Sequence, residues 1–348
     1  MIKEIHYFKK DNGTRLPVDD KYLLPFLSPT TKGTTIRESI PDTSEIFERQ
    51  KGRVLLQIHQ ILHLLREYGV ELNGKRMLDI GTGNGLVPCM LLELSELSSA
   101  IGADPYLDGE HMTSWQSHNH NNALQEFKSF LNTHCRQFID YFTYQDLLEY
   151  ENYSMIPGKI PYKKQSGKQY KFVKIAANEL EGIGQTFDFL YCKAIEHIPD
   201  WDVVFKSIAS VANENAILYC KHRSFFSYLG AHRYSSISIP WGQILLSEKE
   251  YERFIVEFYP DESEKMKDFY YKGLSYPRIT VSQMVKIARK HKLMPLVIIA
   301  EPTRYIDTVA KFIDDIDSFW GIVESNYPYV GAEEVLSGMY HILFRKIV

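Results

Sequence analysis

The chain has 348 residues, of which 44% are hydrophobic and 24% charged, so it is long and apolar enough to bury a sizeable core. This composition excludes disordered, collagen-like and disulfide-scaffold proteins. Forty basic and 44 acidic residues give a net charge of −4, so no strong basic excess indicates a nucleic-acid partner.

Features that would place the chain outside the cytoplasm are missing from the sequence. The four cysteines lie far apart without a C-x-x-C pair, which argues against a disulfide frame or a zinc site: Cys89, Cys135, Cys192 and Cys220. The longest apolar runs, near residues 86–92 and 294–300, are too short to span a bilayer. The first ten residues lack the apolar core of a secretory signal. We therefore expect a soluble, cytoplasmic protein that has no membrane partner.

The pattern of apolar residues predicts an α/β protein that begins with an N-terminal arm over residues 1–49. Its first 45 residues are rich in Pro, Thr, Asp and Lys, and an amphipathic helix is predicted over Ile46–Tyr68. Short apolar runs then alternate with helical patterns, which predicts a mostly parallel sheet covered on both faces. Strands are expected at Arg76–Ile80, Ala100–Ala103, Phe187–Tyr191, Ala216–Cys220, Leu296–Ala300 and Tyr340–Ile347, and helices at Leu86–Leu97 and Thr280–His291.

Two stretches are longer than a minimal α/β unit needs, at about 105–171 and 222–276. The second holds 13 aromatic residues in 55 positions. One interpretation is a satellite core beneath a long insertion. The other, which we favour, is that the two insertions form a cap or lid over a substrate pocket, because long ordered insertions are usually functional.

The most informative motif is Met77-Leu-Asp-Ile-Gly-Thr-Gly-Asn-Gly85, in which a predicted strand runs into three glycines at alternate positions. Glycine lets a flat ligand touch the main chain, and the following helix offers free N–H groups. A dinucleotide site would need a glycine at position 86, which is Leu86. With Asp79 ahead of the glycines, the segment resembles the first motif of class I S-adenosylmethionine-dependent methyltransferases.

Two later segments resemble the same family. Asp104 ends the next predicted strand, where an acidic side chain can accept hydrogen bonds from ribose hydroxyls. The run from Phe187 to Asp200 is similar to the fourth-strand motif of small-molecule methyltransferases. The resemblance covers about residues 50–104, 170–221 and 278–348. It implies a Rossmann-like seven-stranded sheet with helices on both faces, S-adenosylmethionine as cofactor and S-adenosylhomocysteine as product. The cofactor-binding residues that it implies are Asp79, Gly81, Gly83, Gly85, Asp104, Asn178 and Lys193.

The methyl acceptor is predicted to be a small molecule, with a hydroxyl of a metabolite or sugar as the methylated group. Enzymes that methylate amino groups of adenine or glutamine carry an Asn/Asp/Ser-Pro-Pro-Tyr/Phe motif after the fourth strand. Residues 192–195 occupy that place here and do not match it, and the similar residues 326–329 lie near the C-terminus. No Pro-Cys nucleophile follows the fourth strand. A basic run at residues 163–174 is interpreted as a solvated loop or hairpin. An RNA or protein methyltransferase and a non-catalytic S-adenosylmethionine-binding module remain open alternatives, as does the oligomeric state.

Histidines are the best candidates for a catalytic base because their pKa lies near working pH. We rank His232 first, His197 second and His222 third, since all three follow strands at the carboxyl edge of the predicted sheet. His111, His118 and His120 could hold a metal only if they converged with a carboxylate. We interpret them as part of a polar loop and expect no metal.

Overall fold

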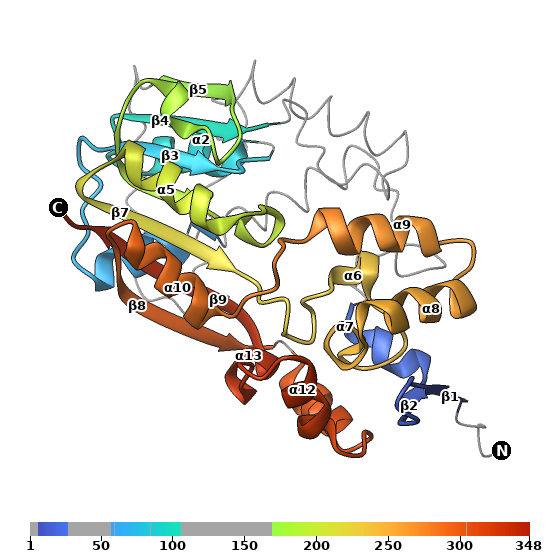
Figure 1. Cartoon of the computed structure of the whole chain (residues 1–348). Coiled ribbons are helices and arrows are strands. Elements are labelled where there is room, and N and C mark those ends of the chain that lie inside the picture. The colour runs from blue at the N-terminus through green and yellow to red at the C-terminus, as the bar shows by residue number, and fades with distance from the viewer. Residues whose placement is uncertain (1–5, 27–56, 59, 84, 106–168, 304) are drawn as a thin grey trace, which may run out of the picture.

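The computed structural model describes residues 6–26, 57–105 and 169–348, apart from residues 59, 84 and 304. A seven-stranded sheet flanked by helices occupies one side, and a mainly helical lobe occupies the other (Figure 1). The mixed α/β, Rossmann-like fold is thus confirmed. The first insertion, with His111, His118 and His120, lies almost entirely outside the described residues, as does the beginning of the predicted helix 46–68. Among the described helices, none combines the length and apolar character that a bilayer span needs.

The sheet has the order β5-β4-β3-β6-β7-β9-β8. All neighbouring pairs from β5 to β7 are parallel, and only β9 runs antiparallel to both of its neighbours. The strands are β3 (Arg76–Ile80), β4 (Ser99–Asp104), β5 (Gln169–Lys174), β6 (Phe187–Cys192), β7 (Ala212–His222), β8 (Leu293–Pro302) and β9 (Ser337–Lys346).

The strand order creates a crevice at the carboxyl ends of β3 and β6. From β3 the chain continues outward through β4 and β5, and it then returns to place β6 on the other side of β3. Ile80 of β3 pairs with Cys192 of β6 and with Ala103 of β4, so the residues that follow these strands emerge at one edge. Ligands of open α/β sheets bind at such a switch point.

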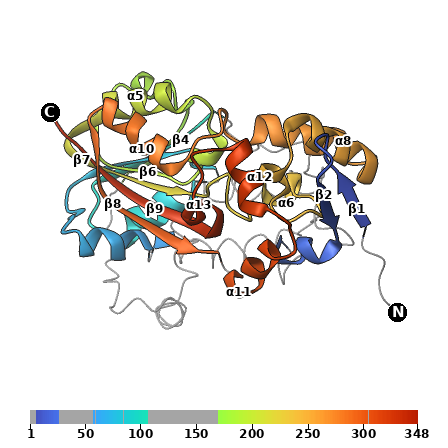
Figure 2. The ribbon, with the colours of Figure 1, turned by 60° about the horizontal axis from the view of Figure 1, so that its bottom comes forward.

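Helices cover both faces of the sheet because its central strands are apolar on both sides. One face packs against α2 (Leu86–Leu94) and a helical segment of which residues 57, 58 and 60–67 are described. The other face packs against α5 (Trp201–Val211) and α10 (Val281–Lys290). Figure 2 shows α5 and α10 on one side of the sheet and the blue helical segment on the other.

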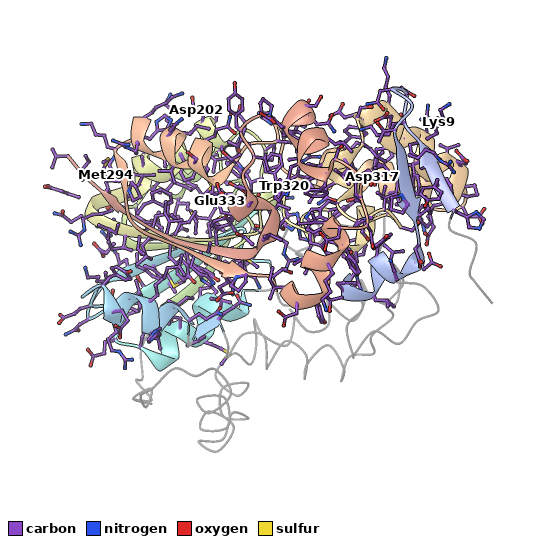
Figure 3. The ribbon with its side chains drawn as sticks, turned by 90° about the horizontal axis from the view of Figure 1, so that it is seen from below. Lys9, Asp202, Met294, Asp317, Trp320 and Glu333 are labelled. Carbon is purple, nitrogen blue, oxygen red and sulfur yellow. The ribbon has the colours of Figure 1, made fainter. Side chains whose placement is uncertain are left out.

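A second hydrophobic core defines what we call the aromatic lobe, built from residues 6–26, 223–275 and 305–336. Its buried side chains come from all three segments, for example Phe8, Trp241 and Phe319. In Figure 3 the labelled Lys9, Asp317 and Trp320 lie in this lobe, while Asp202 and Met294 lie in the sheet half. Its helices are η1 (Asp20–Phe26), α6 (His232–Ser235), α7 (Gly242–Leu245), α8 (Glu248–Phe258), α9 (Ser263–Asp268), η5 (Phe269–Gly273), α11 (Ile306–Val309), η6 (Ala310–Ile313), α12 (Phe319–Asn326) and α13 (Ala332–Leu336).

The lobe explains most of the aromatic density of residues 222–276, because those rings pack mainly against one another. Tyr251 stacks on Tyr270 at 4.2 Å between ring centroids, and Tyr228 meets Trp241 edge-on at 4.8 Å. A satellite core is therefore present. A lid over the acceptor stays a prediction.

Three elements differ from the sequence prediction. The arm expected to be irregular contains a hairpin of β1 (His6–Lys9) and β2 (Arg15–Val18), which buries Phe8 and Leu16 in the aromatic lobe. The basic run that we interpreted as a loop or hairpin ends in strand β5, where Lys171 and Lys174 lie on the outermost described strand of the sheet. Residues 305–336, which we assigned to the methyltransferase-like part of the chain, pack in the aromatic lobe.

A buried ion pair fixes the hairpin to the lobe. Lys10 Nζ lies 3.3 Å from Glu250 Oε2, and both side chains are about 95% buried. The same carboxylate accepts hydrogen bonds from the N–H groups of Asp11 and Ser247, the latter as part of the capping box that starts α8. The pair therefore joins the N-terminal hairpin to the first turn of a helix about 240 residues away.

Candidate active site

A glycine turn connects β3 to α2. Gly81, Gly83 and Gly85 all have positive φ angles, of 68°, 57° and 73°, which side chains with a Cβ rarely adopt. A Cβ on residue 81 would also lie 2.7 Å from the Cβ of Ala194, whereas a Cβ on residue 83 would have none of the described residues within 4 Å apart from its chain neighbours. The turn is thus closed toward β6 and open on the side where a ligand could touch the main chain.

Two carboxylates lie beside this turn. Asp104, at the end of β4, accepts a hydrogen bond of 2.9 Å from the N–H of Gly83. Asp79 accepts one of 2.6 Å from the hydroxyl of Thr82. The pKa of Asp79 is raised to about 7, chiefly by burial and in smaller part by the charge of Asp104, although the Thr82 hydrogen bond and Lys193 act in the opposite direction.

Lys193 and Asn178 extend the same edge. Lys193 directly follows β6 and acts electrostatically on both Asp79 and Glu196, so its charge lies between the glycine turn and the residues beyond β6. Asn178 lies in the turn after β5, and its side chain is exposed. All seven residues predicted to bind cofactor thus lie in the last two positions of strands β3 to β6 or in the segments that follow them. Their contacts with a cofactor stay a prediction.

Beyond β6, the short helix η4 (Ile195–His197) presents Glu196 and His197. The Nδ1 of His197 lies 2.5 Å from the carbonyl oxygen of Gly273, and because a carbonyl only accepts, Nδ1 carries the proton. Burial lowers the pKa of His197, and the same hydrogen bond raises it in part. Burial also raises the pKa of Glu196 to about 7, although Arg223 and Lys193 act in the opposite direction. The imidazole of His197 is therefore held as the neutral Nδ1–H tautomer, in which Nε2 is the acceptor nitrogen.

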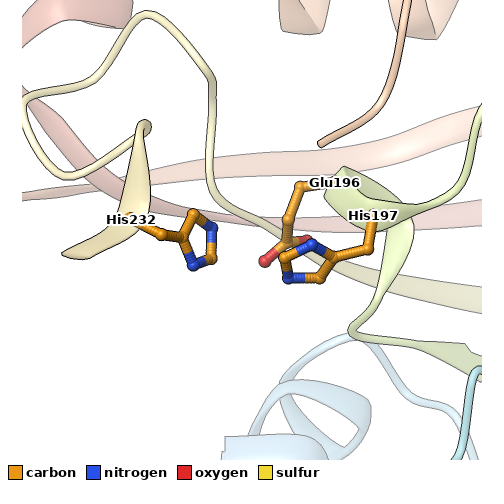
Figure 4. Close-up of side chains that lie close together, drawn as sticks. All are labelled: Glu196, His197 and His232. Atoms are coloured by element: carbon orange, nitrogen blue, oxygen red, sulfur yellow. The ribbon is translucent and has the colours of Figure 1, made fainter. Parts of the chain in front are cut away.

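His232 reaches this point from the aromatic lobe. Its backbone has a positive φ of 52°, uncommon for a residue with a side chain, and a tight turn precedes it. A Cβ on Gly230 would lie 2.3 Å from the carbonyl oxygen of Phe225, so the turn needs glycine. The rings of His197 and His232 are 4.9 Å apart between centroids, and Phe269 lies 5.9 Å from His232. Figure 4 shows the two imidazoles turned toward each other with the Glu196 carboxylate beside them.

His222 is not one of the three side chains that cluster here. It ends β7 with 2% of its side chain exposed, edge-on to Trp201 at 5.2 Å, and its Nδ1 lies 4.0 Å from Glu196 Oε2. Burial lowers its pKa to about 3. The structure thus brings together the first two candidates for the base, while His222 lies between Glu196 and Trp201. A catalytic role for each of the three stays a prediction.

Sequence reasoning missed two groups of this site. Glu196 stands next to His197 in the quoted motif, so the motif itself could have suggested it. The carbonyl of Gly273 is 76 residues away in the chain and orients His197 through a main-chain atom that no residue pattern identifies.

Comparisons with known proteins give one family and many similar folds. The family model described as "Methyltransferase domain" matches residues 48–239, more than half of the chain. No curated protein sequence matches the chain significantly.

Three solved structures illustrate the structural likeness. A candidate sarcosine dimethylglycine methyltransferase from Galdieria sulphuraria is 12% identical, with 84% of each chain covered and a TM-score of 0.42. A candidate S-adenosylmethionine-dependent methyltransferase from Listeria monocytogenes is 11% identical over 82% of this chain and 97% of that one, with a TM-score of 0.41. Phosphoethanolamine N-methyltransferase 2 of Haemonchus contortus, in complex with S-adenosylmethionine, is 15% identical over 83% and 52%, with a TM-score of 0.37.

Proposed function

This chain belongs to the methyltransferase domain family and is an S-adenosylmethionine-dependent enzyme, and on that premise we propose that it methylates a hydroxyl group of a small molecule. The observation that carries the proposal is the meeting of His197 and His232 beyond the glycine turn. A hydroxyl is a weak nucleophile until its proton leaves, and two imidazoles at the acceptor position are suited to removing it.

The geometry also supports an order of binding sites along the sheet edge. The glycine turn, Asp104 and Asn178 lie on the side of β3 to β5, and we assign them to the main-chain, ribose and adenine contacts of the cofactor, in that order. Ala194 packs against Gly81, and the chain runs from it directly into Glu196 and His197. The acceptor would therefore lie next to the sulfonium end of the cofactor, where alignment of the methyl group and the attacking oxygen supplies much of the rate.

The chemistry of the cluster favours a small acceptor over a polymer. His197 and His232 are largely buried, and Phe269, with 2% of its side chain exposed, packs beside them. Among the described residues of the basic run, Lys171 and Lys174 lie on the edge strand β5 and not beside the histidines. A reducing, cytoplasmic setting is part of the proposal, since Cys192 and Cys220 are buried free thiols.

The test is transfer of labelled methyl groups from S-adenosylmethionine to three separate fractions: small metabolites, RNA and protein. We expect label only in the metabolite fraction, in a product that resists the mild base that releases methyl esters. His232→Ala should lower kcat by about 10²–10⁴-fold while cofactor affinity is kept. His291→Ala should leave kcat unchanged, because this histidine follows α10 and pairs with Asp202 of α5. Label in RNA or protein would exclude a small acceptor, and a normal kcat in His232→Ala would remove that residue from the reaction.

A further inference from the structure

Glu196, His197 and His232 form a set of possible metal ligands. One ligand atom from each, a carboxylate oxygen and two imidazole nitrogens, lies within 4.8 Å of the other two. Zinc–ligand bonds of about 2.0–2.2 Å place tetrahedral ligands about 3.5 Å apart, so the three atoms need to approach one another by only about 1 Å. Figure 4 shows that the three side chains come from two separate segments and point to a common space.

The orientation of His197 is typical of a metal ligand. Imidazoles that bind metals usually donate their other N–H to a carboxylate or a backbone carbonyl, which fixes the tautomer and the ring. The carbonyl of Gly273 takes the Nδ1 proton at 2.5 Å and leaves Nε2 as the electron-pair donor. This hydrogen bond fixes the orientation of the ring on the side opposite the cluster.

Glu196 offers a carboxylate group whose hydrogen-bonding capacity the described protein satisfies only in part. Its side chain is 12% exposed, and its Oε2 accepts no hydrogen bond from the described residues. The positive groups that act on it are Arg223 and Lys193, while His222 approaches to 4.0 Å. A divalent ion at the cluster would provide direct coordination for this oxygen.

We propose that Glu196, His197 and His232 bind a divalent transition-metal ion, with Zn²⁺ as the best-suited ion, and leave one position open for the oxygen of the acceptor. Two imidazoles and one carboxylate are the ligands of known catalytic zinc sites, whereas Mg²⁺ and Ca²⁺ prefer an all-oxygen set. This inference rests on the proposed function and names how the acceptor is activated.

The bound ion changes the role of the histidines from bases to ligands. As a Lewis acid, Zn²⁺ lowers the pKa of the coordinated hydroxyl, and the proton passes to water. The oxygen then attacks the methyl carbon, an O–C bond forms, and the C–S bond breaks with its electron pair going to sulfur. The products are the methyl ether and S-adenosylhomocysteine, so the step needs no further reactant. The predicted acceptors are hydroxyls that bind metals well, such as phenols or adjacent diols.

The experiment measures metal binding with no cofactor or acceptor present. The full chain is stripped with a chelator and titrated with Zn²⁺ in a calorimeter, and Co²⁺ is used in parallel because its visible absorption reports nitrogen coordination. We expect one strong site per chain, weakened about 10-fold or more in each of Glu196→Gln, His197→Asn and His232→Asn. Glu196→Asp, which keeps a carboxylate, should retain part of the affinity, and His291→Asn should bind like the wild type.

Folding and cofactor binding are read separately. Thermal unfolding identifies any variant that fails to fold. The Zn²⁺ titration of such a variant is disregarded, and the Co²⁺ spectrum of Glu196→Asp, compared with that of the wild type, is used in its place. Unchanged Zn²⁺ affinity in all three ligand variants overturns the proposal, as does loss of the strong site only in His118→Asn/His120→Asn. If the wild type binds Zn²⁺ at this cluster but transfers no methyl group to a hydroxyl, the metal site stands and the proposed function fails. If the wild type shows no Zn²⁺ site and still transfers methyl groups to a hydroxyl after chelation, the proposed function stands and the metal site fails.

Discussion

The main-chain N–H of Gly83 donates a hydrogen bond of 2.9 Å to Oδ2 of Asp104, which connects the turn after β3 to the end of β4. The contact holds the carboxylate in place before any nucleoside arrives. Because the glycine turn and Asp104 are fixed to each other, a substitution at either position alters both the main-chain contact and the ribose contact of the proposed cofactor site.

Substitution of Asp104 should weaken S-adenosylmethionine binding in two steps. Asp104→Asn keeps one acceptor oxygen and should raise Kd about 10-fold, whereas Asp104→Ala removes both and should raise it about 100-fold, as expected for hydrogen bonds to a charged group of about 1.5–3 kcal/mol. Calorimetry measures both. Asn178→Ala, an exposed position, should have a smaller effect. Equal affinity in Asp104→Ala and the wild type would show that the ribose is held elsewhere.

The buried Asp79 should make the protein less stable as the pH rises from about 4 to about 8. Its pKa is raised from 3.8 to about 7, so the folded state keeps a proton that the unfolded state loses. The resulting stability is complete below about pH 4 and is lost as the pH passes through 7, by at most about 4 kcal/mol. Urea unfolding across this range should show a smaller loss for Asp79→Asn than for the wild type.

Asp188 serves as the control with the opposite sign. Partial burial raises its pKa, but the hydrogen bonds from the N–H of Arg76 and from Asn213 outweigh burial and leave the pKa below 3.8. The ionised form is favoured in the folded state, so its stabilisation is present above pH 4 and disappears in acid. Asp188→Asn should therefore lower stability at neutral pH and lose the difference at low pH. The same pH trend in both variants would rule out burial of Asp79 as the cause.

The Lys10–Glu250 pair should matter chiefly through the cost of an unpaired charge. Glu250→Gln leaves Lys10 buried without its partner and should destabilise the protein by about 3–5 kcal/mol. The double variant Lys10→Met/Glu250→Gln should recover much of that loss, because no buried charge remains. Guanidinium unfolding of the single and double variants gives the coupling energy. Additive losses would mean that the two side chains act independently.

Replacement of residues 223–275 by a short linker should prevent folding. The segment provides most of the buried side chains of the aromatic lobe, and its removal exposes Phe8, Phe319 and Val323. We expect aggregated protein without a cooperative thermal transition. A soluble product that still binds S-adenosylmethionine but transfers no methyl group would instead support a dispensable lid.

The sequence predicted best those parts of the structure that depend on residues close together in the chain. The strand Arg76–Ile80 was predicted residue for residue, because an apolar run between Lys75 and a glycine turn has few alternatives. The strand β5 was missed because its Lys171 and Lys174 make it look like a solvated loop. The glycine turn carried a local signal, and the structure places its predicted partner Asp104 beside it.

The acceptor side of the site was harder to predict because it depends on contacts between distant segments. His197 and His232 were both named from their places after strands, but their approach to 4.9 Å depends on a turn held by Gly230. The N-terminal hairpin packs against Phe254, about 250 residues later in the chain. This contact depends on the shape of the folded lobe, and no repeating sequence pattern predicts it.

Because the aromatic lobe is built from three separate chain segments, its core can form only after the last of them has been synthesised. Phe8 and Leu16 are synthesised well before the side chains that bury them, such as Phe254 and those of residues 309–335. The parallel strands from β3 to β7 are all available once residue 222 has been made. The apolar side chains of the hairpin therefore stay unburied until residues 223–335 are made, and the proposed acceptor side becomes complete after the proposed cofactor side.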